Sequence, residues 1–136
     1  MSHYANLKSN NKSMPTCARE GEEQATLFHW AAMQQGKYPE LAALFHIPNG
    51  GKRGKAEAAR FKKEGVKAGV PDLFLPVACG QYHGLFIEMK RAKGGTLSAA
   101  QKEWRGLLES QGYCWLMCHG WEEASEGIID YMEEKI

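Results

Sequence analysis

Hydrophobic residues recur at helical spacing in some parts of the chain and at strand spacing in others, which outlines an α/β domain. Helical spacing occurs over residues 20–35, 99–110 and 121–134. Between these segments lie apolar runs of strand length, with the sequences LFHIP, VPDLFLPV, GLFIEMK and YCWLMCH. Interleaved helices and strands of this kind predict a mixed central β-sheet flanked by helices.

Capping and turn residues separate the predicted elements. Ser98 is a good N-cap for the helix that follows it, whose inner face we expect to carry Trp104, Leu107 and Leu108. Residues 80–84 form a short, hairpin-like connection between two apolar runs. The two strands that this connection joins are therefore expected to pair as neighbours in the sheet.

Length and composition suit one compact domain. The chain has 136 residues, of which 43% are hydrophobic and 24% charged. Its apolar runs are too short to span a bilayer, and its first residues lack the apolar segment of a secretory signal. We expect residues 1–18 to form a flexible polar arm, followed by one domain over residues 19–136.

Four widely spread cysteines point to free thiols. A structural zinc site needs two close ligand pairs, and no CxxC pair is present. Buried, unpaired thiols in a reducing cytoplasm are the better interpretation. The four residues are Cys17, Cys79, Cys114 and Cys118.

Charge is segregated along the chain although the net charge is only +1. Residues 52–67 hold seven lysines and arginines against two glutamates, whereas residues 120–136 hold six acids against one lysine. The basic segment predicts contacts with a polyanion such as DNA, and the alternative is an ordinary solvated helix face. The candidate phosphate contacts in and before this segment are Asn49, Lys52, Arg53, Lys55, Lys62 and Lys63.

Two acids and a lysine lie where two neighbouring strands meet. Asp72 starts one strand, and Glu88 and Lys90 point to the same face of the next strand because they are two residues apart. Carboxylate oxygens select Mg²⁺ or Mn²⁺, which act on phosphate esters. The alternative is that Asp72 caps a turn and that Glu88 and Lys90 form a solvated edge. An acid within an otherwise apolar strand favours the metal site.

These motifs resemble those of the virus-type replication-repair nuclease (VRR-NUC) family, within the PD-(D/E)XK nuclease superfamily. The matching stretches are REGEEQATLFHWA, IPNGGKR, EGVKAGVPDLFLPV, HGLFIEMKR, GGTLSAAQKEW and GYCWLMCHGWEEA. The resemblance implies a restriction-endonuclease-like core with catalytic residues Asp72, Glu88, Lys90 and Gln101. It also implies a metal-binding acid on the first helix, for which Glu20 is the first candidate, Glu23 the second, and Glu22 a further competitor. Lys93 resembles a second backbone contact.

The resemblance also implies a substrate and an assembly. Stand-alone members of this family, from phages and bacteria, resemble homodimeric enzymes that resolve four-way (Holliday) junctions during DNA repair. We therefore expect a Mg²⁺- or Mn²⁺-dependent endonuclease in the cytoplasm of a bacterial or phage-infected cell. The alternatives are a catalytically silent DNA-binding module on the same fold, a nuclease without structure preference, and a sequence-specific restriction-type enzyme.

Overall fold

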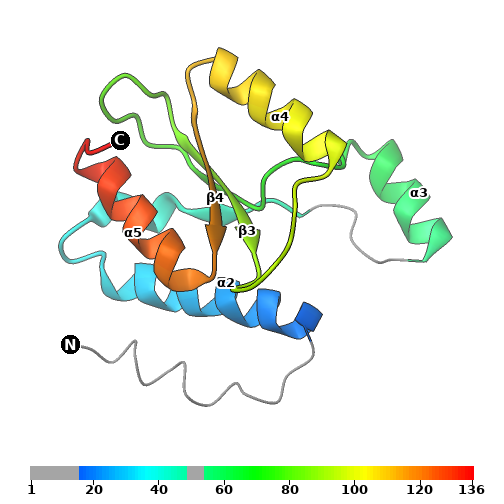
Figure 1. The fold of residues 1–136 in the computed structure, drawn as a ribbon, viewed down its shortest axis with the longest axis horizontal. Helices are drawn as coiled ribbons and strands as arrows, with labels where there is room; N and C mark the ends of the chain where they lie inside the picture. The colour runs from blue at the N-terminus through cyan, green and yellow to red at the C-terminus, as the bar shows by residue number, and fades with distance from the viewer. Residues whose placement is uncertain (1–15, 49–53) are drawn as a thin grey trace.

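A four-stranded mixed sheet forms the centre of the fold (Figure 1). A computed structural model describes residues 16–48 and 54–136, with side chains from residue 21 onward. The strand order is β1-β2-β3-β4; the first two pairs are antiparallel and β3 runs parallel to β4. The strands are β1 (Phe45–His46), β2 (Leu73–Leu75), β3 (Leu85–Lys90) and β4 (Cys114–His119). The predicted mixed sheet and the predicted pairing of β2 with β3 are confirmed.

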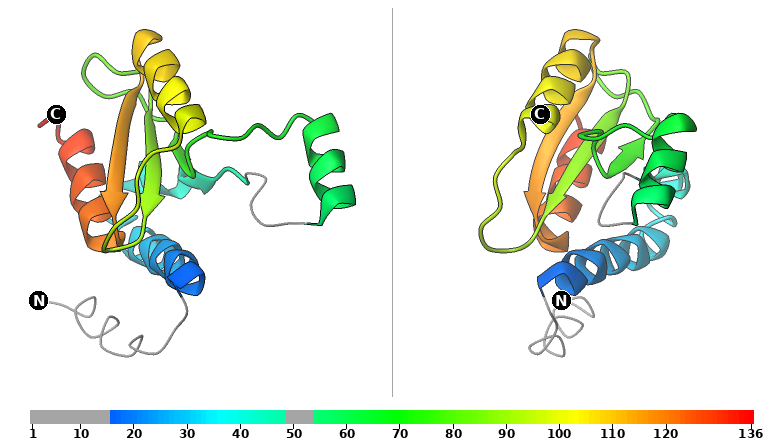
Figure 2. Two further views of the ribbon diagram at one scale, coloured as in Figure 1. Left: turned by 45° about the vertical axis from the view of Figure 1, so that its right-hand side comes forward. Right: turned by 90° about the vertical axis from the view of Figure 1, so that its right-hand side faces the viewer.

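Helices cover both faces of the sheet. Helix α4 lies on one side of the β3–β4 pair and α5 on the other, as Figure 2 shows. Helix α2 packs against α5 and the sheet on the α5 side. The helices are α2 (Thr16–Met33), the 3₁₀ helix η1 (Pro39–Ala43), α3 (Lys55–Lys63), α4 (Ala99–Ser110) and α5 (Trp121–Met132). The first helix thus begins before residue 20, where the sequence pattern predicted its start.

The core fills the space between the sheet and the α2–α5 layer. Alternate residues of β3, Leu85 and Ile87, have fully buried side chains on this face. They pack with Leu27 of α2 and with Ala124 and Ile128 of α5. Burial of these apolar side chains supplies the main driving force for folding. The intervening residues of β3 face α4 instead, and Glu88 and Lys90 are among them.

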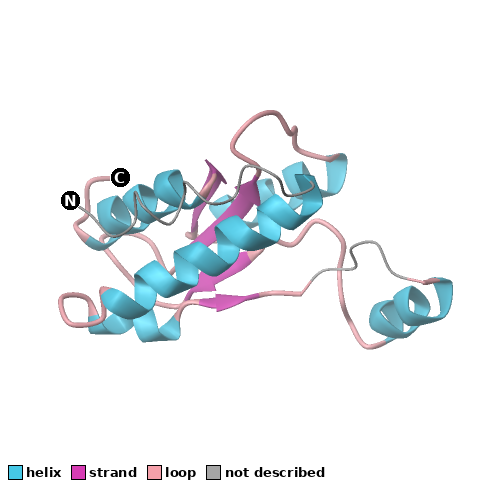
Figure 3. Ribbon diagram, turned by 90° about the horizontal axis from the view of Figure 1, so that it is seen from below, coloured by secondary structure: helices cyan, strands magenta, loops and turns pink. Residues whose placement is uncertain are grey.

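Helix α3 stands away from the sheet. Figures 1 and 3 show it beyond the edge of the domain, and none of its residues is buried. It contains four basic residues and one acid over nine positions. A helix without an apolar face gains little from packing, so its exposed cationic surface is open to a ligand.

One expected inner-face residue of α4 lies outside. Leu108 is buried, but the side chain of Leu107 is 51% exposed, so the prediction for Leu107 was wrong. The side chains of α4 that face the rest of the protein include Gln101, Trp104, Arg105 and Leu108. Their i, i+3, i+4, i+7 spacing defines a narrow stripe, and Leu107 lies one residue off it.

The thiols that the structure describes are free. Cys114 and Cys118 are buried and Cys79 is partly buried, whereas the side chain of Cys17 is outside the described residues. Burial raises the pKa of Cys114 to about 11 and that of Cys118 to about 12. Thiols with such pKa values are poor nucleophiles at neutral pH, so these cysteines serve as packing residues.

Among the described helices, none is long and apolar enough to cross a membrane.

Candidate active site

Asp72 and Glu88 lie side by side at the end of the β2–β3 pair. The register pairs Leu73 with Ile87, so the next step along the ladder places Asp72 opposite Glu88. Asp72 Oδ2 accepts a hydrogen bond of 2.7 Å from the backbone N–H of Met89. This bond fixes the Asp72 carboxylate against β3, next to Glu88. The structure thus brings together the two acids that the sequence predicted to converge.

The carboxylate of Glu88 sits in a protected position. Its side chain is 2% exposed, on a strand whose neighbouring residues Ile87 and Met89 belong to the core. Removing a carboxylate from water is costly unless polar groups, cations or a metal ion compensate it. A buried acid of this kind, beside a second carboxylate, is typical of a functional site.

Lys90 is held by Gln101 of α4. Lys90 Nζ donates to Gln101 Oε1 at 3.2 Å, and the same oxygen accepts the backbone N–H of Ser98 at 2.9 Å. Ser98 Oγ in turn accepts the backbone N–H of Gln101, which completes a capping box at the start of α4. The predicted N-cap is confirmed, and the cap orients Gln101 toward Lys90.

Two glycines with positive φ lie in the loops next to Asp72 and Lys90. Gly69 has a φ of +88°, and a Cβ there would lie 2.6 Å from the carbonyl carbon of Ala100 in α4. The indole N–H of Trp104 donates to the Ala68 carbonyl at 3.2 Å. This hydrogen bond links the loop before Asp72 to α4. Gly95 has a φ of +85°, and a Cβ there would reach the methylenes of Lys90 at 3.4–3.8 Å. Helix α4 therefore positions both Asp72 and Lys90.

Glu23 has a structural role that the sequence did not reveal. Its Oε2 accepts the backbone N–H of Trp121 at 2.7 Å, and this N–H belongs to the first turn of α5, where the helix itself supplies no acceptor. The N-cap residue of α5 is Gly120, which has no side chain to do this. A carboxylate of α2 thus caps α5.

The side chain of Glu20, the first candidate for the helix acid, is outside the described residues.

Replacing Glu23 with alanine is expected to destabilise the protein by about 1–2 kcal/mol, the usual cost of losing a helix cap. Glu126→Ala removes an exposed acid of the capped helix α5 and should change the free energy of unfolding by less than about 0.5 kcal/mol. Urea unfolding of both variants measures the difference. Equal stabilities of the two variants would contradict the capping role.

The candidate DNA contacts fall into two groups. Lys55, Lys62 and Lys63 are exposed on α3, and Lys93 is exposed in the loop after β3. The second group, Asn49, Lys52 and Arg53, lies outside the described residues. The described lysines are therefore accessible to a polyanion, as the sequence predicted.

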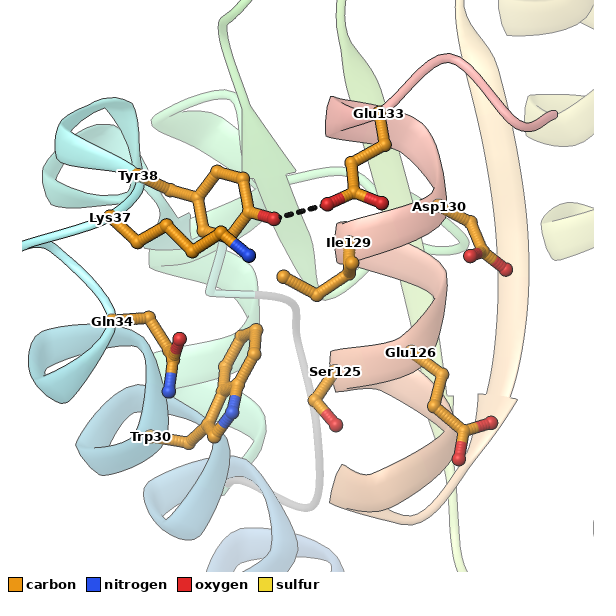
Figure 4. A pocket seen from close by; sticks show the side chains of 9 residues that line it. All are labelled: Trp30, Gln34, Lys37, Tyr38, Ser125, Glu126, Ile129, Asp130 and Glu133. Atoms are coloured by element: carbon orange, nitrogen blue, oxygen red, sulfur yellow. Dashed lines mark hydrogen bonds between the residues drawn. The ribbon is translucent and has the colours of Figure 1, made fainter.

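A pocket of about 380 Å³ lies between α2 and α5 (Figure 4). Trp30 and Tyr38 line one side and the acids of α5 the other, with the Tyr38 hydroxyl donating to Glu133. None of its lining residues belongs to the candidate site. Because α2 and α5 cover the opposite face of the sheet from Lys90 and Gln101, the pocket is separate from the Asp72–Glu88 pair.

Two carboxylates are available to hold a divalent metal ion. Among the side chains of residues 21–48 and 54–136, no group of three His, Cys, Asp or Glu is assembled for metal binding. Mg²⁺ needs only one or two carboxylates when waters and substrate phosphate complete its shell. The Asp72–Glu88 pair fits this requirement.

His119 is a site neighbour that the sequence did not single out. It pairs with Lys90 across the parallel β3–β4 ladder, so both side chains emerge on one face. Its Nδ1 lies 3.7 Å from Glu123 Oε1. The sequence offered no partner spacing for this histidine, because Lys90 lies on a different strand and only the register brings the two together.

Comparison with known proteins identifies the family. Residues 16–122 match the VRR-NUC domain. A solved structure described as a VRR_NUC domain protein is 35% identical to this chain, with a TM-score of 0.72 over 85% of this chain and 88% of its own. No curated protein is similar enough to count as a relative. The match over most of the chain, together with the agreement in fold, shows that this protein belongs to the VRR-NUC domain family.

Proposed function

We propose that the protein is a divalent-metal-dependent endonuclease that hydrolyses phosphodiester bonds of DNA. The observation that carries this proposal is the buried Glu88 carboxylate beside Asp72, in a chain of the VRR-NUC family. A DNA-binding module without catalysis would gain nothing from burying the Glu88 carboxylate beside a second acid. Free, buried thiols also suit a protein of the reducing cytoplasm of a bacterial or phage-infected cell.

Asp72 and Glu88 are the proposed metal ligands, with Glu20 as the third. Their oxygens are hard ligands that suit Mg²⁺ or Mn²⁺. When bound, such an ion polarises the scissile phosphate and lowers the pKa of an attacking water. Asp72 Oδ2 accepts the Met89 N–H, and this bond orients the Asp72 carboxylate beside Glu88.

Lys90 is proposed to stabilise the negative charge that builds on the phosphate. Its ammonium group is held in place by Gln101 Oε1, and its methylenes rest against Gly95. A cation held in position before the reaction needs no rearrangement as charge develops. Gln101 is the positioning residue, since it acts through Lys90.

The proposed substrate is branched DNA such as a four-way junction, cut during DNA repair by a homodimer. Two copies of a small domain would present two active sites to the two strands of a junction. The exposed lysines of α3 support backbone contacts that do not depend on sequence. A nuclease without structure preference is the alternative.

Cleavage of a labelled four-way junction beside a linear duplex of matched sequence tests this substrate. We expect faster cutting of the junction at equal protein and metal concentrations. Equal rates on both would leave the chemistry intact and remove the preference for branched DNA. Cutting of the linear duplex at one sequence would favour a restriction-type enzyme.

Replacing both Lys52 and Arg53 with alanine should weaken DNA binding and flatten its dependence on salt. Each lost phosphate contact lowers the slope of log K against log salt by about 0.9, so we expect a change of about 2 for the pair. Lys37→Ala combined with Lys135→Ala removes two charges elsewhere and should leave the slope unchanged. Fluorescence anisotropy with labelled duplex measures both. An unchanged slope in the first variant would remove residues 52–53 from the interface.

A further inference from the structure

Four aromatic residues occupy one register position across all four strands. Phe45 of β1 pairs with Phe74 of β2, Phe74 with Phe86 of β3, and Phe86 with Trp115 of β4. Residues that pair directly across a sheet point to the same face. We call these four residues the aromatic row; it lies on the α4 face, opposite the core.

The aromatic row runs next to the candidate catalytic residues. Phe74 and Phe86 lie two residues from Asp72 and Glu88 along β2 and β3, so they occupy the neighbouring positions on the same face. Successive side chains on one face of a strand are about 7 Å apart. This is about the length of one nucleotide, and a base attached near a phosphate at Asp72 and Glu88 would reach the row.

The rings are ordered by their mutual contacts. Phe74 and Phe86 stack with centroids 4.2 Å apart and planes at 15°. Phe45 meets Phe74 edge to face, with centroids 5.8 Å apart and planes at 80°. Aromatic contacts of both kinds are favourable. The contact with Phe74 therefore restricts the rotation of the Phe45 ring. Less side-chain entropy is then lost when Phe45 binds a ligand.

Exposure increases along the row toward the edge strand. Trp115 is 7% exposed, because Arg105 of α4 lies over its ring at 4.8 Å. Phe74 and Phe86 are partly buried, and Phe45 is 46% exposed. The covered end of the row therefore packs against α4. The open end presents the ring of Phe45 to solvent on the edge strand, one strand away from Asp72.

We propose that Phe45 stacks on an unpaired nucleobase close to the scissile phosphate, so that, among branched DNAs, those with unpaired nucleotides at the cut are the preferred substrate. This inference rests on the proposed nuclease function. An aromatic side chain binds any base through its π-face, which suits a site that does not read sequence. A second copy of the chain is the weaker candidate, because a stable interface needs about 800 Å² per partner and Phe45 offers a single ring.

The test compares Phe45→Ala with the wild type on a labelled DNA flap with unpaired nucleotides at its branch. We expect cleavage to fall about tenfold, the effect of losing one stacked base. Phe45→Trp should restore the rate, because it retains a stacking surface. Leu107→Ala, which removes another exposed apolar side chain, should cut like the wild type.

A flap whose unpaired nucleotides are abasic identifies the contact. The wild type should cut it about as slowly as Phe45→Ala cuts the normal flap, and Phe45→Ala should lose nothing more. If Phe45→Ala loses a further tenfold on the abasic flap, or equals the wild type on the normal one, base stacking is ruled out. If the wild type cuts the four-way junction but neither flap, unpaired nucleotides are not its substrate and this inference fails. If it cuts no DNA at all, the proposed nuclease function itself fails.

Sedimentation of Phe45→Ala and the wild type separates base stacking from contact with a second copy. We expect the same oligomeric state for both proteins at the concentration of the cleavage assay. A dimeric wild type beside a monomeric variant would show that Phe45 packs against a second copy, which would overturn the proposal.

Discussion

Glu88→Gln is expected to lower DNA cleavage by at least about a thousandfold, which corresponds to roughly 4 kcal/mol of transition-state stabilisation. Glutamine has nearly the same shape as glutamate, so the 2% exposed position stays filled. The lost group is the charge that is proposed to bind the metal ion. Asp72→Asn should lower cleavage to a similar extent, because it also removes a charge proposed to bind the metal ion. The fold should be kept, because the amide oxygen of asparagine can still accept the Met89 N–H. Single-turnover cleavage of labelled DNA measures both variants.

The loss must come from chemistry and not from unfolding. Thermal unfolding of Glu88→Gln should remain cooperative, and its affinity for DNA should stay within about threefold of the wild type, because phosphate contacts elsewhere dominate binding. Glu126→Gln, at an exposed acid on α5, should cut normally. Retained cleavage in Glu88→Gln would remove this residue from the active site.

Gly69→Ala is expected to destabilise the protein by about 2–4 kcal/mol and to slow cleavage. A non-glycine residue at a φ of +88° is strained by about 1–2 kcal/mol. The added Cβ would also lie 2.6 Å from the backbone of Ala100, which must shift to relieve the contact at a further cost of about 1–2 kcal/mol. Because this loop carries Asp72 and α4 carries Gln101, both candidate site residues would move. Urea unfolding and cleavage rate are the measurements.

Gly65→Ala is the matched control for this glycine. Gly65 also has a positive φ, +99°, but a Cβ there meets nothing within 4 Å. It should therefore lose only the strain energy, about 1–2 kcal/mol, and keep its cleavage rate. Equal losses of stability and activity in the two variants would show that the close approach of the loop to α4 does not position the site.

The central part of the candidate site could be predicted because it depends on local patterns. The hairpin-like connection between β2 and β3 predicted that these strands pair, and this pairing places Asp72 beside Glu88. The Ser98 N-cap of α4 is likewise a short-range signal, whereas the return hydrogen bond from the Gln101 side chain was found only in the structure. Periodicity and turn chemistry were sufficient for both.

Features that depend on distant contacts could not be predicted. The hydrogen bond by which Glu23 caps α5 joins residues 98 positions apart, so no local pattern indicates it. Leu107 looked like an inner-face residue, but α4 contacts the protein through a narrower stripe. The aromatic row needs the register of four strands, two of which have only two or three residues. Tertiary packing decides each of these outcomes.

The measurement that tests the central claim most directly is the dependence of cleavage on metal. Wild-type protein and Glu88→Gln are incubated with a labelled four-way junction in chelator, then with Mg²⁺ or Mn²⁺ in excess. The proposed mechanism predicts no cutting in chelator, full cutting by the wild type once metal is added, and none by the variant. Cutting in chelator would contradict metal dependence, and folded wild-type protein that binds the junction but never cuts it would identify a silent DNA-binding module.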